Sequence, residues 1–157
     1  MSKIFDLNGK VALLTGASKG MGLAMATGLA EHGATVIISA RKQDQLEAAA
    51  GQINKTCGTE RAIAVAANAG SKTELAALVE SARSSAGPID IVVGNAGVNP
   101  YFGPTSEISD AAYEKTMSVS PTRWVARNDL TYERFVRETV SPAAQLDQSS
   151  CGRTSVG

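Results

Sequence analysis

Three glycines near the start of the chain could form a phosphate-binding turn. At a junction between a strand and a helix, glycines permit a tight turn and let backbone N–H groups approach an anion at the positive end of the helix. Ordinary turns also use glycine, so the context matters. A short apolar run precedes the glycines and a second begins about 20 residues later, as a dinucleotide site requires. The residues expected to contact the cofactor here are Gly16, Ser18, Lys19, Gly20, Met21 and Gly22.

A second polar segment, Gly94-Asn95-Ala96-Gly97, follows the fourth apolar run of the chain. The segment Thr15 to Gly22 resembles the Thr-Gly-x-x-x-Gly-x-Gly motif of the short-chain dehydrogenase/reductase family, with every position matched. The second segment is similar to the family's Asn-Asn-Ala-Gly motif and lacks its first asparagine. This resemblance extends from about Leu7 to Val119. It implies an oxidoreductase that interconverts an alcohol and a carbonyl, with Asn95, Ala96 and Gly97 beside the cofactor.

The second predicted strand ends with Ser39-Ala40-Arg41-Lys42 and has no acidic residue at that point. In dinucleotide sites an Asp or Glu here binds the ribose 2′-hydroxyl of NAD, whereas a basic residue accommodates the 2′-phosphate of NADP. Arg41 with its neighbouring cations therefore favours NADP over NAD, the alternative being that these cations only solvate a helix start. Asn68 stands where the family has an aspartate near the adenine amino group, and we expect its amide oxygen to accept that hydrogen bond.

The resemblance also implies a catalytic tyrosine and a lysine four residues later, with an upstream serine and an asparagine. The lysine lowers the pKa of the tyrosine hydroxyl, which can then serve as general acid and base. In this chain no tyrosine has that lysine: the pairs are Tyr101 and Thr105, Tyr113 and Met117, and Tyr132 and Val136. Ser120 also replaces the family asparagine. We therefore assign no catalytic residue and expect the chain to be impaired or inactive alone.

Apolar runs typical of buried parallel strands alternate with helical periodicity. The predicted strands cover residues 11–15, 35–39, 62–66 and 89–93, and the predicted helices lie near 21–31, 44–57, 71–87 and 109–119. Such alternation at one unit per ~25 to 30 residues predicts right-handed βαβ crossovers. The expected fold class is α/β: a Rossmann-like, doubly wound parallel sheet in three αβα layers, truncated after about the fourth or fifth βα unit.

Several helix ends carry recognisable signals. Asp44-x-x-Glu47 and Ser71-x-x-Glu74 have the pattern of capping boxes, and Ser109 that of an N-cap. Gly33 and Gly58 stand where left-handed helix caps belong.

Length and composition limit the classes of function. The 157 residues correspond to one domain, at about 150 residues per domain. With 15 basic and 15 acidic residues the net charge is +0, which argues against nucleic-acid and membrane partners. No apolar run reaches the ~18 residues of a membrane span and no signal-peptide core is present, so we expect a cytoplasmic protein. Cys57, Cys151 and His32 do not suffice for a metal site.

The composition changes at Ser120. Beyond it every basic residue is arginine, whereas lysine predominates before it, and isoleucine no longer occurs. We therefore divide the chain into an NADP-binding Rossmann-like domain, residues 1–119, and a divergent tail, residues 120–157, which we expect to be partly disordered.

The fourth predicted strand lacks the outer neighbours that a complete sheet of this kind has. Its backbone groups can pair with another chain, so we expect a homo-oligomer or pairing with a full-length relative through this strand. Two further readings stay open besides a cofactor-binding protein of the oxidoreductase type. The chain could be a non-catalytic nucleotide-binding or interaction module, or a non-functional fragment. The substrate is not specified by these residues.

Overall fold

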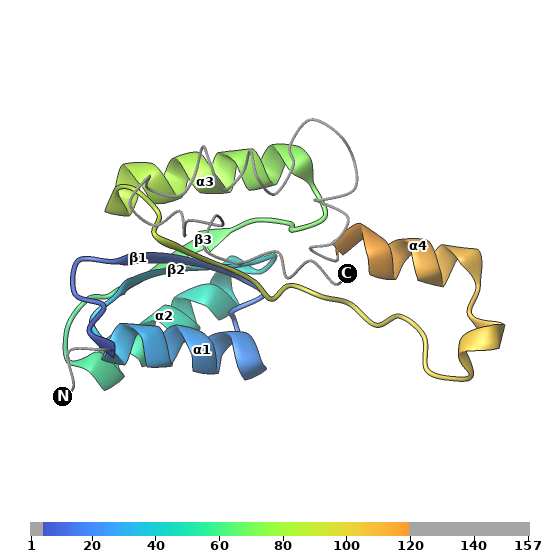
Figure 1. Ribbon diagram of the computed structural model, residues 1–157, viewed down its shortest axis with the longest axis horizontal. Coiled ribbons are helices and arrows are strands. Elements are labelled where there is room, and N and C mark those ends of the chain that lie inside the picture. The colour runs from blue at the N-terminus through green and yellow to red at the C-terminus, as the bar shows by residue number, and fades with distance from the viewer. Residues whose placement is uncertain (1–4, 120–157) are drawn as a thin grey trace, which may run out of the picture.

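The computed structural model describes residues 5–119, which form a parallel sheet between two layers of helices (Figure 1). The strands are β1 (Val11–Thr15), β2 (Thr35–Ala40), β3 (Ala62–Ala66) and β4 (Ile91–Gly94). They are ordered β3-β2-β1-β4, and all neighbours run parallel. The predicted α/β, Rossmann-like class is confirmed. The central strand β1 is buried along its whole length, as its uninterrupted apolar run predicts.

Helices cover both faces of this sheet. They are α1 (Gly20–Glu31), α2 (Gln43–Cys57), α3 (Lys72–Ala86) and α4 (Asp110–Val119), with a short 3-10 turn, η2 (Thr105–Glu107), before the last. Helices α1 and α2 lie on one face and α3 on the other (Figure 1). Because side chains alternate along a strand, β1 and β2 supply apolar residues to both layers.

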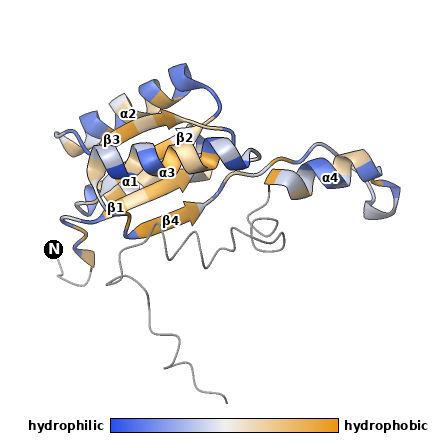
Figure 2. Cartoon of the chain, turned by 90° about the horizontal axis from the view of Figure 1, so that it is seen from above, coloured by the Kyte–Doolittle hydropathy of each residue, from blue (hydrophilic) through white to orange (hydrophobic). Residues whose placement is uncertain are grey.

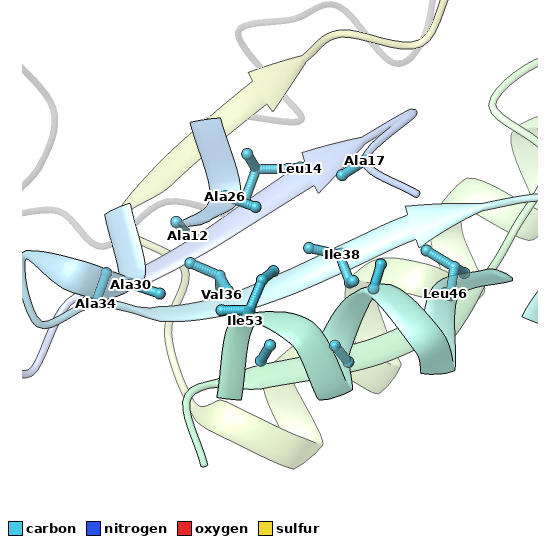
Figure 3. Packing of buried hydrophobic residues seen from close by; sticks show 13 residues of the cluster. Ala12, Leu14, Ala17, Ala26, Ala30, Ala34, Val36, Ile38, Leu46 and Ile53 are labelled. Carbon is cyan, nitrogen blue, oxygen red and sulfur yellow. The ribbon is translucent and has the colours of Figure 1, made fainter. Parts of the chain in front are cut away.

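The larger core lies between the sheet and helices α1 and α2, as Figure 3 shows. Its fully buried bulky side chains are Leu14, Ile38, Leu46 and Ile53. Where α1 crosses β1, the buried residues are the small Ala26 and Ala30. A small side chain lets a helix backbone approach the sheet closely. The short loop of residues 16–19 places the start of α1 directly after the carboxyl end of β1. The second core, against α3, is built on Leu13, Ile37, Leu78 and Ile89.

Most helix ends follow the predicted signals, although the capping box at Ser71 forms only in part, because Glu74 Oε2 accepts from the Asn68 N–H and the Ser71 N–H donates to the Asn68 carbonyl. Ser71 caps α3, its hydroxyl accepting a hydrogen bond from the Glu74 N–H, and Ser109 accepts one from the Ala112 N–H at the start of α4. Gly58 has the left-handed conformation after α2, and Gly33 follows α1 with a φ of 106°.

The predicted capping box at Asp44 is wrong. Helix α2 begins one residue earlier, at Gln43, and its N-cap residue Lys42 makes no side-chain capping bond. The Gln43 side chain explains the shift, because its Oε1 accepts a hydrogen bond from the Ala66 N–H at 3.1 Å and its Nε2 donates to Glu47 Oε1 at 3.0 Å. These bonds tie the first turn of α2 to the end of β3, so Asp44 lies inside that turn.

Strand β4 begins at Ile91, two residues later than predicted, because the preceding Asp90 forms side-chain hydrogen bonds to the residues at the start of β1. Its two carboxylate oxygens accept hydrogen bonds from the Val11 backbone N–H at 2.9 Å and from Lys10 Nζ at 3.0 Å. Within the described part of the chain, β4 pairs only with β1, and Figure 2 shows it as a hydrophobic strand at the sheet edge.

Helix α4 stands apart from the sheet at the end of a long extended segment (Figure 1). None of its residues is buried. The predicted divergent tail, residues 120–157, lies outside the described residues. Among residues 5–119, no helix has the length and apolar character needed to cross a bilayer. In the same range, no three His, Cys, Asp or Glu residues gather in a way that could hold a metal ion.

Candidate dinucleotide site

A cleft with a volume of about 750 Å³ opens at the carboxyl ends of the strands. This size lies within the ~300–1,000 Å³ of typical small-molecule sites. All the residues that the sequence pointed to line it: Gly16, Ser18, Lys19, Gly20, Met21, Gly22, Arg41, Asn68, Asn95, Ala96 and Gly97. They come from the ends of β1, β2 and β4 and from the turn after β3, so the order of the parallel sheet alone brings them together.

The glycine loop connects β1 to α1 and has little free space. Gly16 and Gly20 adopt positive φ values of 67° and 60°, which side chains disfavour. A Cβ added at Gly16 would lie 2.8 Å from Ala96 Cα, and one added at Gly22 would lie 2.6 Å from Asn95 Nδ2. The loop is also tied to β2, because the Ala17 N–H donates to the Ser39 carbonyl at 3.2 Å.

The start of α1 is electropositive and open to a ligand. Its N-cap residue Lys19 makes no side-chain capping bond, and its first turn holds no acidic residue. The first N–H groups of a helix have no partner within the helix, and the helix dipole gives this end about half a positive charge. A phosphate would satisfy both the unpaired donors and the dipole.

The segment after β4 braces the glycine loop from the other side. Asn95 Nδ2 donates to the carbonyl oxygens of Thr15, at 3.2 Å, and Gly16, at 3.0 Å. The Ala96 N–H donates to the Thr15 hydroxyl at 3.2 Å. These bonds fix the conformation of the loop backbone before a ligand binds. The loop is thus preorganised for a phosphate, which would accept hydrogen bonds from backbone N–H groups at the start of α1.

The end of β2 carries the cations of the cleft. Arg41 and Lys42 follow the strand, both exposed, and Lys19 faces the same cleft from the glycine loop. Just before them, near the end of β2, stands Ser39, which is 2% exposed. This position therefore holds a serine and not an acidic residue. No Asp or Glu is among the described residues that line the cleft. The local charge is therefore positive, although the whole chain is neutral.

The turn after β3 forms the far wall. It is attached to β2 by the Ala67 N–H, which donates to the Ala40 carbonyl at 2.9 Å. Asn68 follows, with its side-chain Oδ1 accepting a hydrogen bond from the Gly70 N–H at 3.0 Å. Its backbone N–H donates to Glu74 Oε2 at 2.8 Å.

Several residues that line the cleft were not predicted from the sequence: Gln45, Ala67, Ala69, Leu75, Leu78, Val98 and Val119. The two leucines belong to the apolar stripe of α3, and periodicity assigns such a stripe to the core without showing that its first turns border a cleft. Val119 comes from α4, whose position no local pattern specifies. The tyrosines of the described region stay outside the lining: Tyr101 donates to the Pro104 carbonyl at 3.3 Å, and Tyr113 is 49% exposed.

A parallel sheet of order 3-2-1-4, with a glycine-rich turn between its central strand and the next helix, defines a dinucleotide-binding protein of the Rossmann type. The sequence model of the family described as short chain dehydrogenase matches residues 10–136. The chain therefore belongs to the short-chain dehydrogenase/reductase family. The match continues past Val119, the residue near which the motifs predict the resemblance to end.

Individual relatives agree with this assignment. Dehydrogenase/reductase SDR family member 4 of Caenorhabditis elegans is 33% identical over 130 residues, which cover 83% of this chain and 50% of the relative. The 2-dehydro-3-deoxy-D-gluconate 5-dehydrogenase of Formosa agariphila is 32% identical, covering 98% of this chain and 58% of the relative. The chain thus spans about half the length of the curated relatives it matches.

Solved structures show the same fold with either cofactor. L-Sorbose reductase from Gluconobacter frateurii, complexed with NADPH and L-sorbose, is 33% identical with a TM-score of 0.72, covering 89% of this chain and 49% of that one. The 3-ketoacyl-(acyl-carrier-protein) reductase from Brucella melitensis, complexed with NADH, is 32% identical with a TM-score of 0.68, covering 85% and 50%.

Proposed function

We propose that this chain binds NADP(H), with the diphosphate at the glycine loop and the 2′-phosphate beside Arg41. The position of Arg41 carries the proposal. It directly follows β2 and faces the same cleft as Lys19 and Lys42, while no acidic residue of the described range lines that cleft. An acid at the end of β2 would select the 2′-hydroxyl of NAD instead.

The expected selectivity follows from the strength of charge-assisted hydrogen bonds. A hydrogen bond to a charged group contributes about 1.5–3 kcal/mol, and Arg can approach a phosphate with two parallel N–H donors. Arg41 alone is therefore expected to favour NADPH over NADH by about tenfold or more. The surrounding cations add attraction without the geometric selectivity of a guanidinium group.

The proposal assigns this chain cofactor binding without independent catalysis. Bound NADPH supplies a hydride for carbonyl reduction, the type of reaction that the family performs. The loop and the cations hold and orient the dinucleotide, but no tyrosine in the sequence has a lysine four residues later to move the accompanying proton. Binding and turnover are thus separable properties of this chain.

Isothermal titration calorimetry of the full chain with NADPH and with NADH tests the proposal. We expect the Arg41→Ala variant to bind NADPH about tenfold more weakly and to bind NADH as the wild type does. Lys55→Ala is the matched control, because this exposed cation of α2 does not line the cleft. Equal affinities of the wild type for the two dinucleotides, or binding of neither, would contradict the proposal.

A second candidate function is an interaction module that pairs through the edge strand β4. Among the described residues β4 has β1 as its one neighbour, and its residues Ile91, Val92 and Val93 are all apolar and half-buried. They contribute to both faces of the sheet, with Val92 on the α3 side. An edge without a charged residue is a template for strand pairing, so a second copy or a full-length relative fits here.

Light scattering at micromolar concentrations tests this second candidate. We expect the wild type to self-associate and the Val92→Lys variant to shift toward the monomer, because a charge at a strand edge opposes pairing. Ala76→Lys adds the same charge to the exposed face of α3 and serves as the control. NADPH binding by each variant reports that it has folded, and a monodisperse monomeric wild type would contradict the candidate.

A further inference from the structure

The turn that leads into β1 contains the only asparagine-glycine pair in the sequence, Asn8-Gly9. The Lys10 N–H donates a hydrogen bond to the Leu7 carbonyl at 3.0 Å, which closes a turn of four residues, and Gly9 has a φ of 75°. Asparagine followed by glycine is a frequent pair in tight turns, because glycine adopts positive φ without steric cost. Both residues of the pair are exposed, so water reaches them.

The backbone nitrogen of Gly9 is free to react with its neighbour. Within residues 5–119 the Gly9 N–H has no hydrogen-bond partner. A Cβ added to Gly9 would have no heavy atom within 4 Å beyond the adjacent residues, so nothing packs against this side of the turn. Glycine also samples more backbone conformations than other residues, and it has no Cβ to obstruct an attack by its own nitrogen. An unhindered amide nitrogen therefore directly follows Asn8.

We propose that Asn8 is a site of spontaneous deamidation, and that the product weakens the junction between β1 and the turn after α1. The Gly9 nitrogen loses its proton to a base in solution and attacks Asn8 Cγ. A new C–N bond closes a succinimide ring, and the side-chain nitrogen leaves as ammonia. Water then adds to either ring carbonyl and breaks its bond to nitrogen, which gives isoaspartate or aspartate. The overall reaction consumes water and changes no oxidation state.

The contacts of Asn8 show what deamidation would remove. Its side-chain Nδ2 and its backbone N–H both donate to Asp6 Oδ1, at 2.6 Å and 3.0 Å. Its Oδ1 lies against Gly33, where an added Cβ would be 2.5 Å from this oxygen. A carboxylate in place of the Asn8 amide has no N–H to donate, so two anionic groups would face each other where the side-chain hydrogen bond was. Isoaspartate would also lengthen the backbone within the turn.

The turn joins three elements at the amino ends of the strands. The Leu7 N–H donates to the His32 carbonyl at the end of α1, at 2.8 Å, and the Lys10 carbonyl accepts from the Thr35 N–H at the start of β2, at 2.9 Å. The cleft opens at the opposite, carboxyl ends of the strands. We therefore expect deamidation to lower the stability of the chain, and this inference does not depend on the proposed cofactor.

Urea unfolding of the full chain tests the consequence for stability. Asn8→Asp reproduces the aspartate product and should unfold at a lower urea midpoint than the wild type, with an unchanged slope. Adding Asp6→Asn should recover part of the loss, because an amide there can donate to the new carboxylate. Asn99→Asp makes the same substitution in an exposed loop residue and should keep the wild-type midpoint. A wild-type midpoint in Asn8→Asp, or no recovery with Asp6→Asn, would contradict the proposed weakening.

Mass spectrometry of the full chain, aged at mildly alkaline pH and then digested with trypsin, tests the reaction itself. Cleavage after lysine places Asn8 in the peptide of residues 4–10, and Asn54, which precedes Lys55, in the peptide of residues 43–55. We expect the first peptide to convert to aspartate and isoaspartate forms while the second keeps its amide. Gly9→Ala should slow the conversion several-fold, because a Cβ on the attacking residue hinders ring closure.

Three results would overturn the proposed reaction: an Asn8 peptide that keeps its amide, equal loss of amide at Asn8 and Asn54, or an undiminished rate in Gly9→Ala. A circular dichroism spectrum unchanged from the wild type confirms that Gly9→Ala is folded, so that its rate is interpretable. The comparison of Asn8 with Asn54 in the wild type needs no variant and decides the proposal even if Gly9→Ala does not fold.

Discussion

The three glycines of the loop meet two different physical requirements at the residue scale. Gly20 has no heavy atom within 4 Å of an added Cβ, so its φ of 60° is the feature that requires glycine. At Gly22 an added Cβ would overlap the Gly16 carbonyl oxygen and approach Asn95 Nδ2. The motif predicts all three positions from the sequence. The contact with Asn95, far along the chain, follows only from the pairing of β1 with β4.

Replacing Gly22 with alanine should therefore damage both stability and binding. Overlap with the backbone of the loop is expected to cost about 1–3 kcal/mol of unfolding free energy and to weaken NADPH binding, because the loop must move. Gly28→Ala, in the same helix and with nothing near its added Cβ, should stabilise the chain by up to ~1 kcal/mol. Urea unfolding and calorimetry measure both effects. Equal stability of the two variants would contradict the steric explanation.

Three residues of the cleft differ in how well the sequence predicts their position in the site. Arg41 could be placed at the cleft from the sequence, because the residue that follows β2 lies at the carboxyl edge of a parallel sheet. Asn68 could be placed in the site, but its hydrogen bond to the Gly70 N–H depends on the path of the turn after β3, which no motif specifies. Val119 could not be found, since α4 reaches the cleft through an extended segment whose path no motif encodes.

At the scale of elements, strands β1 to β3 were predictable because each is a continuous apolar run in a sheet covered on both faces. The start of α2 shows what the sequence pattern could not predict. A capping-box pattern was present at Asp44, but Gln43 forms tertiary hydrogen bonds to the end of β3 and extends the helix by one residue. When local signals allow a helix to begin at either of two neighbouring residues, tertiary contacts determine which one is its first residue.

Asp90 is the element-scale link between β1 and β4, and its two partners should differ in importance. Asp90→Ala leaves the N–H of the buried Val11 without its acceptor and should cost about 1–3 kcal/mol. Lys10→Ala removes a cation whose side chain is 47% exposed and should cost under ~1 kcal/mol. Chemical denaturation of both variants measures the difference. A larger loss in Lys10→Ala would show that the ion pair, and not the backbone bond, joins the strands.

At the scale of the whole molecule, the described sheet contains the strands that hold the adenosine and diphosphate portions of a dinucleotide in a Rossmann fold. The order of the strands was predictable from the alternation of strands and helices, because right-handed crossovers leave few topologies open. The position of α4, apart from the sheet, was not predictable, since none of its residues is buried in a core.

The proposed separation of cofactor binding from catalysis belongs to the scale of the whole chain, and kinetics can test it. Purified protein with saturating NADPH and a panel of carbonyl compounds should oxidise the cofactor no faster than the uncatalysed background. The reason is that the proton-transfer pair of the family is missing from the sequence. Absorbance at the nicotinamide band follows the reaction. Steady oxidation that disappears in Gly22→Ala would show that a different group in this chain transfers the proton.

The central claim, that the cleft binds NADP(H) through the glycine loop and Arg41, is tested most directly by a crystal structure of the chain grown with NADP⁺. The account predicts the diphosphate against the backbone of residues 16–22, at the start of α1, and the 2′-phosphate within hydrogen-bond distance of the Arg41 guanidinium. A dinucleotide bound in another orientation, or crystals with no dinucleotide in this cleft at saturating concentration, would contradict it.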